Sequence, residues 1–188
     1  MYRAFALLLA AALFVPSFAA NADEAAWALL AKGGQVVLIR HALTDPGVGD
    51  PPGFRLDDCG TQRNLSAAGR REAERLGAAM RAHGIRVSRV MSSPWCRCLE
   101  TARIAFGVDA RVEPALGNLF GQGDRERQLA GFRAIVAAAP KDGNLVLVTH
   151  GSTTAAFTGI NPGTAEMVIV TPESGGKYSV AGRIPVSN

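Results

Sequence analysis

Apolar residues along the chain follow two patterns, short unbroken runs and longer stretches with helical spacing. Unbroken runs rich in β-branched residues are typical of strands that are covered on both faces. The two clearest are QVVLIR at residues 35–40 and NLVLVTH at 144–150. Weaker strand patterns occupy residues 86–93, 166–172 and 177–186, and the turn-rich ESGG between the last two predicts a hairpin.

Helical patterns lie between these strands. Ser66 can cap a helix whose small and apolar residues recur at steps of three and four, and Gly84 can end it. A second helix is expected to start near Pro94, and a third carries an apolar stripe that includes Leu129 and Val136. Helices that alternate with buried strands predict an α/β fold, here a three-layer α/β/α sandwich with a mostly parallel central sheet.

Residues 1–22 have the pattern of a secretory signal peptide. Arg3 is followed by an apolar stretch from Ala4 to Val15 and by a small-residue cleavage site that ends at Ala22. The apolar stretch is too short to span a bilayer, so we expect no stable membrane anchor. Cleavage near Ala22 would leave a single domain over residues 23–188 in the periplasm or outside the cell.

The charge of the chain is mildly basic. It has 20 Lys and Arg against 16 Asp and Glu, a formal net charge of +4. Many of these charges fall in residues 69–89, where they alternate with apolar residues at helical spacing, which is typical of a solvated helix face. We therefore expect no nucleic-acid partner.

Three cysteines, Cys59, Cys96 and Cys98, suit an oxidising compartment in which a disulfide can form. Cys96 and Cys98 are two residues apart on an expected helix, so their side chains diverge. Cys59 is therefore expected to pair with one of them, and the pattern does not decide which. The CRC sequence lacks the Cys-x-x-Cys spacing of thiol redox proteins, which makes that class of function a poor candidate.

Cationic side chains gather where the two clearest strands end. Arg40 and His41 end one apolar run and His150 ends the other, and the carboxyl ends of strands in such a sheet meet at one edge. Small residues after His150 begin a helix whose free backbone N–H groups would face the same edge. Arg97, on the first turn of the helix near Pro94, can turn back toward it. This constellation predicts an anion-binding pocket.

Four segments in this order resemble the ordered motifs of the histidine phosphatase, or phosphoglycerate mutase-like, superfamily: LIRHALT, NLSAAGRREAERLG, SSPWCRCLETA and LVTHGS. The resemblance extends from Gln35 to about Gly159. It implies an exported member without a cap domain, a phosphoric monoester hydrolase in which His41 becomes phosphorylated. Arg40, Arg97 and an imidazolium at His150 would surround the phosphoryl oxygens, with no metal and no cofactor.

The resemblance also suggests which other side chains bind substrate. Three are expected to do so: Thr44, Arg63 and Asn118. Many family members carry a glutamate as general acid, and Asn118 occupies the best-matching position here. An amide cannot protonate a leaving alkoxide, so other carboxylates are candidate general acids: Glu113, Asp124 and Asp45.

Two explanations of the missing glutamate do not need another acid. The substrate can carry a good leaving group, such as a phosphohistidine or an acyl phosphate, that departs with little protonation. Alternatively, the protein is a slow or inactive relative that binds phosphate or glycan phosphate. The segment between Thr101 and His150 is too short for a cap domain, so we expect an open pocket. A small ester, a sugar phosphate such as a lipopolysaccharide heptose phosphate, or a phosphoprotein could enter it.

Overall fold

A six-stranded sheet forms the centre of the computed structural model, which describes residues 18–119 and 124–186. The strands follow the order β3-β2-β4-β1-β5-β6 across the sheet. Their bounds are β1 Val36–Arg40, β2 Val87–Ser92, β3 Arg111–Val112, β4 Asn144–Thr149, β5 Met167–Pro172 and β6 Tyr178–Ile184. The pairs β1/β4, β2/β4 and β2/β3 are parallel, whereas β5 runs antiparallel to β1 and β6. The predicted mostly parallel sheet is confirmed.

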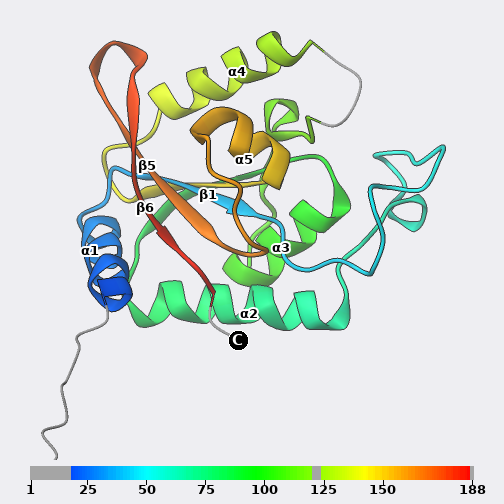
Figure 1. The fold of residues 1–188 in the computed structure, drawn as a ribbon, viewed down its shortest axis with the longest axis horizontal. Coiled ribbons are helices and arrows are strands. Elements are labelled where there is room, and N and C mark those ends of the chain that lie inside the picture. Colours follow the sequence, from blue (N-terminus) through cyan, green and yellow to red (C-terminus); the bar gives the residue numbers. More distant parts are fainter. Residues whose placement is uncertain (1–17, 120–123, 187–188) are drawn as a thin grey trace, which may run out of the picture.

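Five helices cover the two faces of this sheet (Figure 1). Their bounds are α1 Phe18–Lys32, α2 Ala67–Ala82, α3 Cys96–Phe106, α4 Arg125–Ala137 and α5 Gly151–Thr158. In β1, Val37 and Ile39 pack into the core under α1, α2 and α3, while Val36 and Leu38 pack under α4 and α5. Because strand side chains alternate between faces, an unbroken apolar run fits this double cover. The three-layer α/β/α sandwich is therefore confirmed.

Most predicted elements lie within a residue or two of their expected positions. All five expected strands form, and β5 and β6 pair as the predicted hairpin. Ser66 caps α2 by accepting a hydrogen bond from the backbone N–H of Gly69 at 3.0 Å. The start of α3 differs, because the helix begins at Cys96 rather than at Pro94. Trp95 is its N-cap, with extended backbone angles and a carbonyl that accepts from the first turn.

Two elements were not expected from the sequence, the helix α1 and the short edge strand β3. The helix α1 begins at Phe18, ahead of the predicted cleavage site, and buries Trp27 and Leu30 in the core. Residues 1–17 of the expected signal peptide lie outside the described residues. Among the helices of the described residues, none has the length and apolar character needed to cross a membrane.

A disulfide joins Cys59 to Cys96, with their Cα atoms 5.7 Å apart. It links the 3₁₀-helix at Cys59–Thr61 to the first residue of α3. Cys98 remains a buried thiol, and burial raises its pKa to about 12, so the thiolate that redox chemistry requires is disfavoured. The structure thus decides the pairing that the sequence left open.

Candidate active site

The carboxyl ends of β1, β2 and β4 meet at one edge of the sheet, as the sequence predicts. Arg40, the last residue of β1, pairs with Thr149, and the N–H of His41 donates to the carbonyl of Thr149 at 2.9 Å. His150 follows β4 directly and caps α5. The imidazole rings of His41 and His150 lie edge to face with centroids 5.4 Å apart. The two histidines therefore share one site although 108 residues lie between them in the sequence.

The ring of His41 is held in a form suited to nucleophilic attack. Its Nδ1 lies 2.9 Å from the carbonyl oxygen of Ala42. Because a carbonyl only accepts, Nδ1 carries the hydrogen and Nε2 of the neutral ring keeps its lone pair. Burial, supported by the charges of Arg97 and Arg40, lowers the pKa of His41 to about 3 against the opposing effect of the Ala42 hydrogen bond. At neutral pH, Nε2 is therefore available to attack an electrophile.

His150 is also neutral, in contrast to the imidazolium expected from the resemblance. Burial first, and then His41 and Arg97, hold its pKa well below the usual histidine range. Its Nε2 lies 2.8 Å from Oγ of Ser93, whose hydroxyl can donate to it and leave the ring hydrogen on Nδ1. The neutral form of His150 is favoured because the ring is buried among cations, which oppose a further positive charge.

Three arginines from three parts of the chain line this site. Arg40 donates from Nη1 to the carbonyl of Pro162 at 2.9 Å, and Arg63 donates to Oγ1 of Thr44 at 2.5 Å. Arg97 is only 1% exposed. Two predicted substrate-binding residues, Thr44 and Arg63, are thus joined to one another by a hydrogen bond.

Unsatisfied hydrogen-bond donors concentrate at the same edge of the sheet. Five buried side-chain polar atoms of the described residues have no hydrogen-bond partner, and four of them belong to the predicted pocket. They are Nε of Arg40, Nε of Arg63, Nε of Arg97 and Nδ1 of His150. Buried donors without an acceptor are rare in native proteins and call for a specific explanation. An oxyanion bound among them would supply the acceptors.

The loop after His41 is held by contacts from two of the sequence motifs, NLSAAGRREAERLG and SSPWCRCLETA. A Cβ at Gly69 would lie 1.8 Å from the carbonyl oxygen of Leu43, so only glycine lets α2 approach this closely. The N–H of Ser66 donates to the same carbonyl at 3.0 Å. On the other side, Oγ1 of Thr101 accepts from the N–H of Ala42 at 3.0 Å. The helices α2 and α3 together fix the backbone that carries His41.

Asp50 is a site residue that the sequence analysis missed. Its carboxylate forms a two-pronged ion pair with Arg97, with Nη1 to Oδ1 at 2.7 Å and Nη2 to Oδ2 at 3.2 Å. It also accepts from the N–H of Arg63 at 3.0 Å and from the indole N–H of Trp95 at 3.1 Å. Burial opposes ionisation, but the hydrogen bonds from Arg97 and Arg63 outweigh it, so the pKa of Asp50 is lowered and the group is ionised. Its setting, the aperiodic DPGVGDPPG, offered no signal beyond a turn-rich loop.

The candidate general acids occupy three different settings. Glu113 accepts from the N–H of Ala115 at 3.3 Å and caps a 3₁₀-helix, and Asp124 caps α4. Asp45 is an exposed residue at the start of the loop that carries Asp50. Asn118, in contrast, accepts from the hydroxyl of Ser152 at 2.7 Å and so lies beside the first turn of α5, the helix that follows His150.

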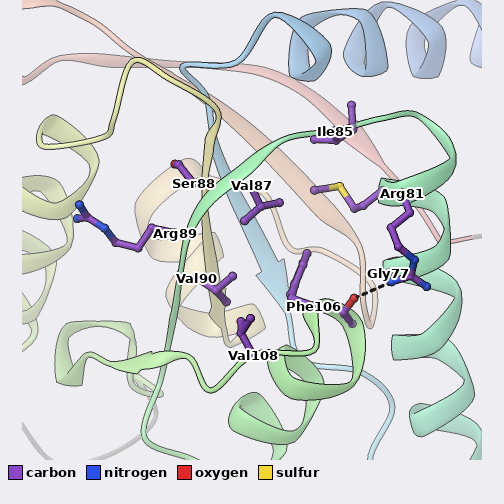
Figure 2. Close-up of a pocket in the computed structure, with 11 residues that line it drawn as sticks. Gly77, Arg81, Ile85, Val87, Ser88, Arg89, Val90, Phe106 and Val108 are labelled. Carbon is purple, nitrogen blue, oxygen red and sulfur yellow. Dashed lines mark hydrogen bonds between the residues drawn. The ribbon is translucent and has the colours of Figure 1, made fainter.

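Both histidines of the site are buried. His41 is 5% exposed and His150 is 2% exposed, although the chain has no room for a cap domain. The loop after β1 also places Asp50 against Arg97. A cavity of about 310 Å³ does exist between α2, β2 and α3 (Figure 2). Since it is lined by Val87 and Val90 from the first part of β2, it lies away from the carboxyl ends of the strands.

No group of three His, Cys, Asp or Glu side chains within residues 18–119 and 124–186 is arranged to hold a metal ion. The side chains described above comprise two imidazoles, three guanidiniums and one carboxylate. Such a set can bind a multiply charged oxyanion and present a nitrogen nucleophile to it.

Comparison with known proteins is consistent with this geometry. No curated protein sequence matches the chain significantly. Among solved structures, the protein histidine phosphatase SixA in complex with tungstate is 17% identical, with a TM-score of 0.61 over 80% of this chain and 96% of that one. A mycobacterial glucosyl-3-phosphoglycerate phosphatase with bound vanadate is 21% identical, with a TM-score of 0.57 over 79% of this chain and 97% of that one. The sequence profile of branch 1 of the histidine phosphatase superfamily matches residues 36–122, which include His41, Arg97 and the motifs that position them. Over residues 36–122 the chain thus matches branch 1 of the histidine phosphatase superfamily, and its fold is that of the solved phosphatases.

Proposed function

We propose that this protein is a phosphatase that hydrolyses a terminal phosphoryl group through a phosphohistidine on His41. The observation that carries the proposal is the cluster of four unpartnered donors, three guanidinium Nε atoms and Nδ1 of His150, around the neutral ring of His41. A phosphoryl group offers several oxygen acceptors at one point, which matches this set of donors.

The reaction proceeds in two displacements. Nε2 of His41 attacks phosphorus, and the bond to the leaving-group oxygen breaks with its electron pair staying on that oxygen. Water then attacks the phosphohistidine, releases orthophosphate and returns the electron pair to Nε2. Arg40, Arg63 and Arg97 stabilise the charge on the phosphoryl oxygens in both steps. A phosphoryl dianion beside His150 raises the pKa of that ring and favours a further charged hydrogen bond.

The substrate class depends on whether a residue of the site can protonate the leaving group. Asn118 occupies the position where many family members carry glutamate. Its amide is too weak an acid to protonate a leaving alkoxide. Glu113, Asp124 and Asp45 remain candidate donors. We expect faster turnover of substrates whose leaving groups depart as stable anions, such as aryl phosphates, acyl phosphates and phosphohistidines, than of alkyl or sugar phosphates. Export to the periplasm or beyond, by the expected signal peptide, is part of the same proposal.

The test is turnover of an aryl phosphate by the wild type, His41→Ala and His83→Ala. His83 is the matched control, because it is the third histidine of the chain and stacks on Trp27 at the end of α2. We expect His83→Ala to keep wild-type kcat and His41→Ala to lose turnover. Rapid acid-free quenching should trap an acid-labile phosphoryl group on the wild type and on His83→Ala, but not on His41→Ala. Equal turnover by the wild type and His41→Ala would refute the phosphohistidine.

A second candidate function is a phosphate- or glycan-phosphate-binding protein without catalysis. The amide of Asn118 and the burial of His41 favour it. It is distinguished by the same samples: saturable phosphate binding together with aryl phosphate turnover no greater than that of His41→Ala would establish the binding protein in place of the enzyme.

A further inference from the structure

We propose that Asp50 is an intramolecular ligand of the phosphoryl site, which a terminal phosphoryl dianion displaces and a phosphodiester monoanion does not. Asp50 would thereby determine which phosphate-bearing ligands enter. This inference rests on the proposed function, because it assigns to Arg97 the role of a phosphoryl-binding residue.

The contacts of Asp50 are those that a phosphoryl group would need. Its two carboxylate oxygens accept hydrogen bonds from Nη1 and Nη2 of Arg97, and Oδ1 also accepts from the backbone N–H of Arg63. Carboxylates and phosphates bind arginine in the same two-pronged manner, so they compete for one fork. The Asp50 side chain is 5% exposed and the Arg97 side chain is 1% exposed, so a substrate cannot reach the fork while Asp50 holds it.

The segment that carries Asp50 has a backbone and surroundings that allow it to move away from Arg97. Residues 45–54 contain no helix or strand, and three glycines in it, Gly47, Gly49 and Gly53, have positive φ angles. A cavity of about 420 Å³ lies along residues 45–52 and is bounded on the other side by Gln62, Arg63 and Asn64. The segment is attached at one end by the pairing of Thr44 with Leu65 and at the other by the Cys59–Cys96 disulfide. Movement between these points exposes Arg97 without disturbing the core.

The number of acceptors explains the discrimination. With Asp50 in place, the Nε atoms of three arginines and Nδ1 of His150 still have no acceptor. A terminal phosphoryl group has three free oxygens and about two negative charges, so it can replace Asp50 on Arg97 and also satisfy some of these donors. A phosphodiester has two free oxygens and one charge, which equals what the carboxylate already offers. Exchange is therefore favourable for the dianion and gains nothing for the diester.

Trp95 provides a probe in the wild-type protein. Its indole N–H donates to Asp50, whereas the other tryptophan of the chain, Trp27, is buried against His83. Displacement of Asp50 breaks the Trp95 hydrogen bond. We expect inorganic phosphate, at about pH 8, to change the emission of Trp95 with the same midpoint as its binding isotherm by calorimetry, and we expect dimethyl phosphate to leave it unchanged. Phosphate binding without a change in Trp95 emission would overturn the proposal.

The matched variants are Asp50→Asn and Asp57→Asn. Both remove one negative charge from the same loop, but the Asp57 side chain is 86% exposed and lies 3.7 Å from Arg55. If Asp50 occupies the site for about 90% of the time or more, its removal should tighten phosphate binding at least tenfold. Asp50→Asn should also acquire measurable affinity for dimethyl phosphate, and Asp57→Asn should behave as the wild type.

Three outcomes decide between explanations. Unchanged or weaker phosphate binding by Asp50→Asn would show that Asp50 positions Arg97 rather than competing for it, and would refute the proposal. If Asp50→Asn does not fold even with phosphate present, the Trp95 titration of the wild type decides. If aryl phosphate is turned over in a His41-dependent manner, but Trp95 emission does not respond to phosphate or Asp50→Asn does not bind phosphate more tightly, this inference alone is rejected. Absence of His41-dependent turnover would reject the proposed function.

Discussion

Replacement of Gly69 by alanine tests whether the approach of α2 to the His41 loop matters for catalysis. The new Cβ would lie 1.8 Å from the carbonyl oxygen of Leu43, so α2 and the loop must separate by about 1 Å or more. Overpacking of this kind costs about 1–3 kcal/mol, and the higher helix propensity of alanine returns up to about 1 kcal/mol. The net cost is then about 0–3 kcal/mol, so we expect Tm to fall by up to about 12 °C for a domain of this size.

The effect on activity should exceed the effect on stability. Leu43 is two residues from His41, and displacement of a reacting group by about 1 Å can lower the rate by about 100-fold. The matched control is Gly77→Ala, where the new Cβ would lie 2.1 Å from the carbonyl oxygen of Ala105 in the contact between α2 and α3. We expect the two variants to lose similar stability. Gly77→Ala should keep kcat for an aryl phosphate, whereas Gly69→Ala should lose about two orders of magnitude. Equal kcat in both variants would refute the reasoning.

Three further predictions concern pH, the disulfide and the anion site. The depressed pKa values of His41 and His150 mean that the unfolded chain takes up protons first as pH falls below 6.5, so the free energy of unfolding should decrease from there toward about pH 3, with a smaller slope in His41→Ala. Reduction of Cys59–Cys96, which closes a loop across a sequence separation of 37 residues, should lower the free energy of unfolding by about 3–4 kcal/mol in urea titrations. The Cys59→Ser/Cys96→Ser double variant should be insensitive to reductant, and a further loss would contradict the assignment. Vanadate should raise the Tm of the wild type and leave that of Arg97→Ala unchanged; a full shift in the variant would remove Arg97 from the anion site.

The strands and the site edge were predictable because they depend on local sequence. An apolar run such as QVVLIR buries both of its faces wherever its neighbours lie, and a polar residue directly after it must stand at the end of the strand. For this reason the pattern alone predicts that Arg40, His41 and His150 share one edge of the sheet. It also predicts the cap at Ser66, since a capping hydrogen bond spans only three residues.

Contacts between distant segments were not predictable in the same way. Nothing in a turn-rich loop indicates that Asp50 meets Arg97, 47 residues further along the chain, because that encounter depends on the path of the loop. The start of α3 at Cys96 was missed for a related reason, and so was the helix α1, whose first five residues lie within the predicted signal peptide. In both cases packing and backbone geometry overrode the local preference of the sequence.

The sequence by itself determined the layered α/β fold, the edge at which the site forms and the pairing of Arg40 with His41 at the end of a buried strand. Only the tertiary structure decided the partner of Cys59, the lowered pKa of His150 and the ion pair between Asp50 and Arg97. Periodicity and strand ends are properties of neighbouring residues. Charge state, disulfide pairing and access depend on distances between residues that are remote in sequence, and on how much water folding removes from around them.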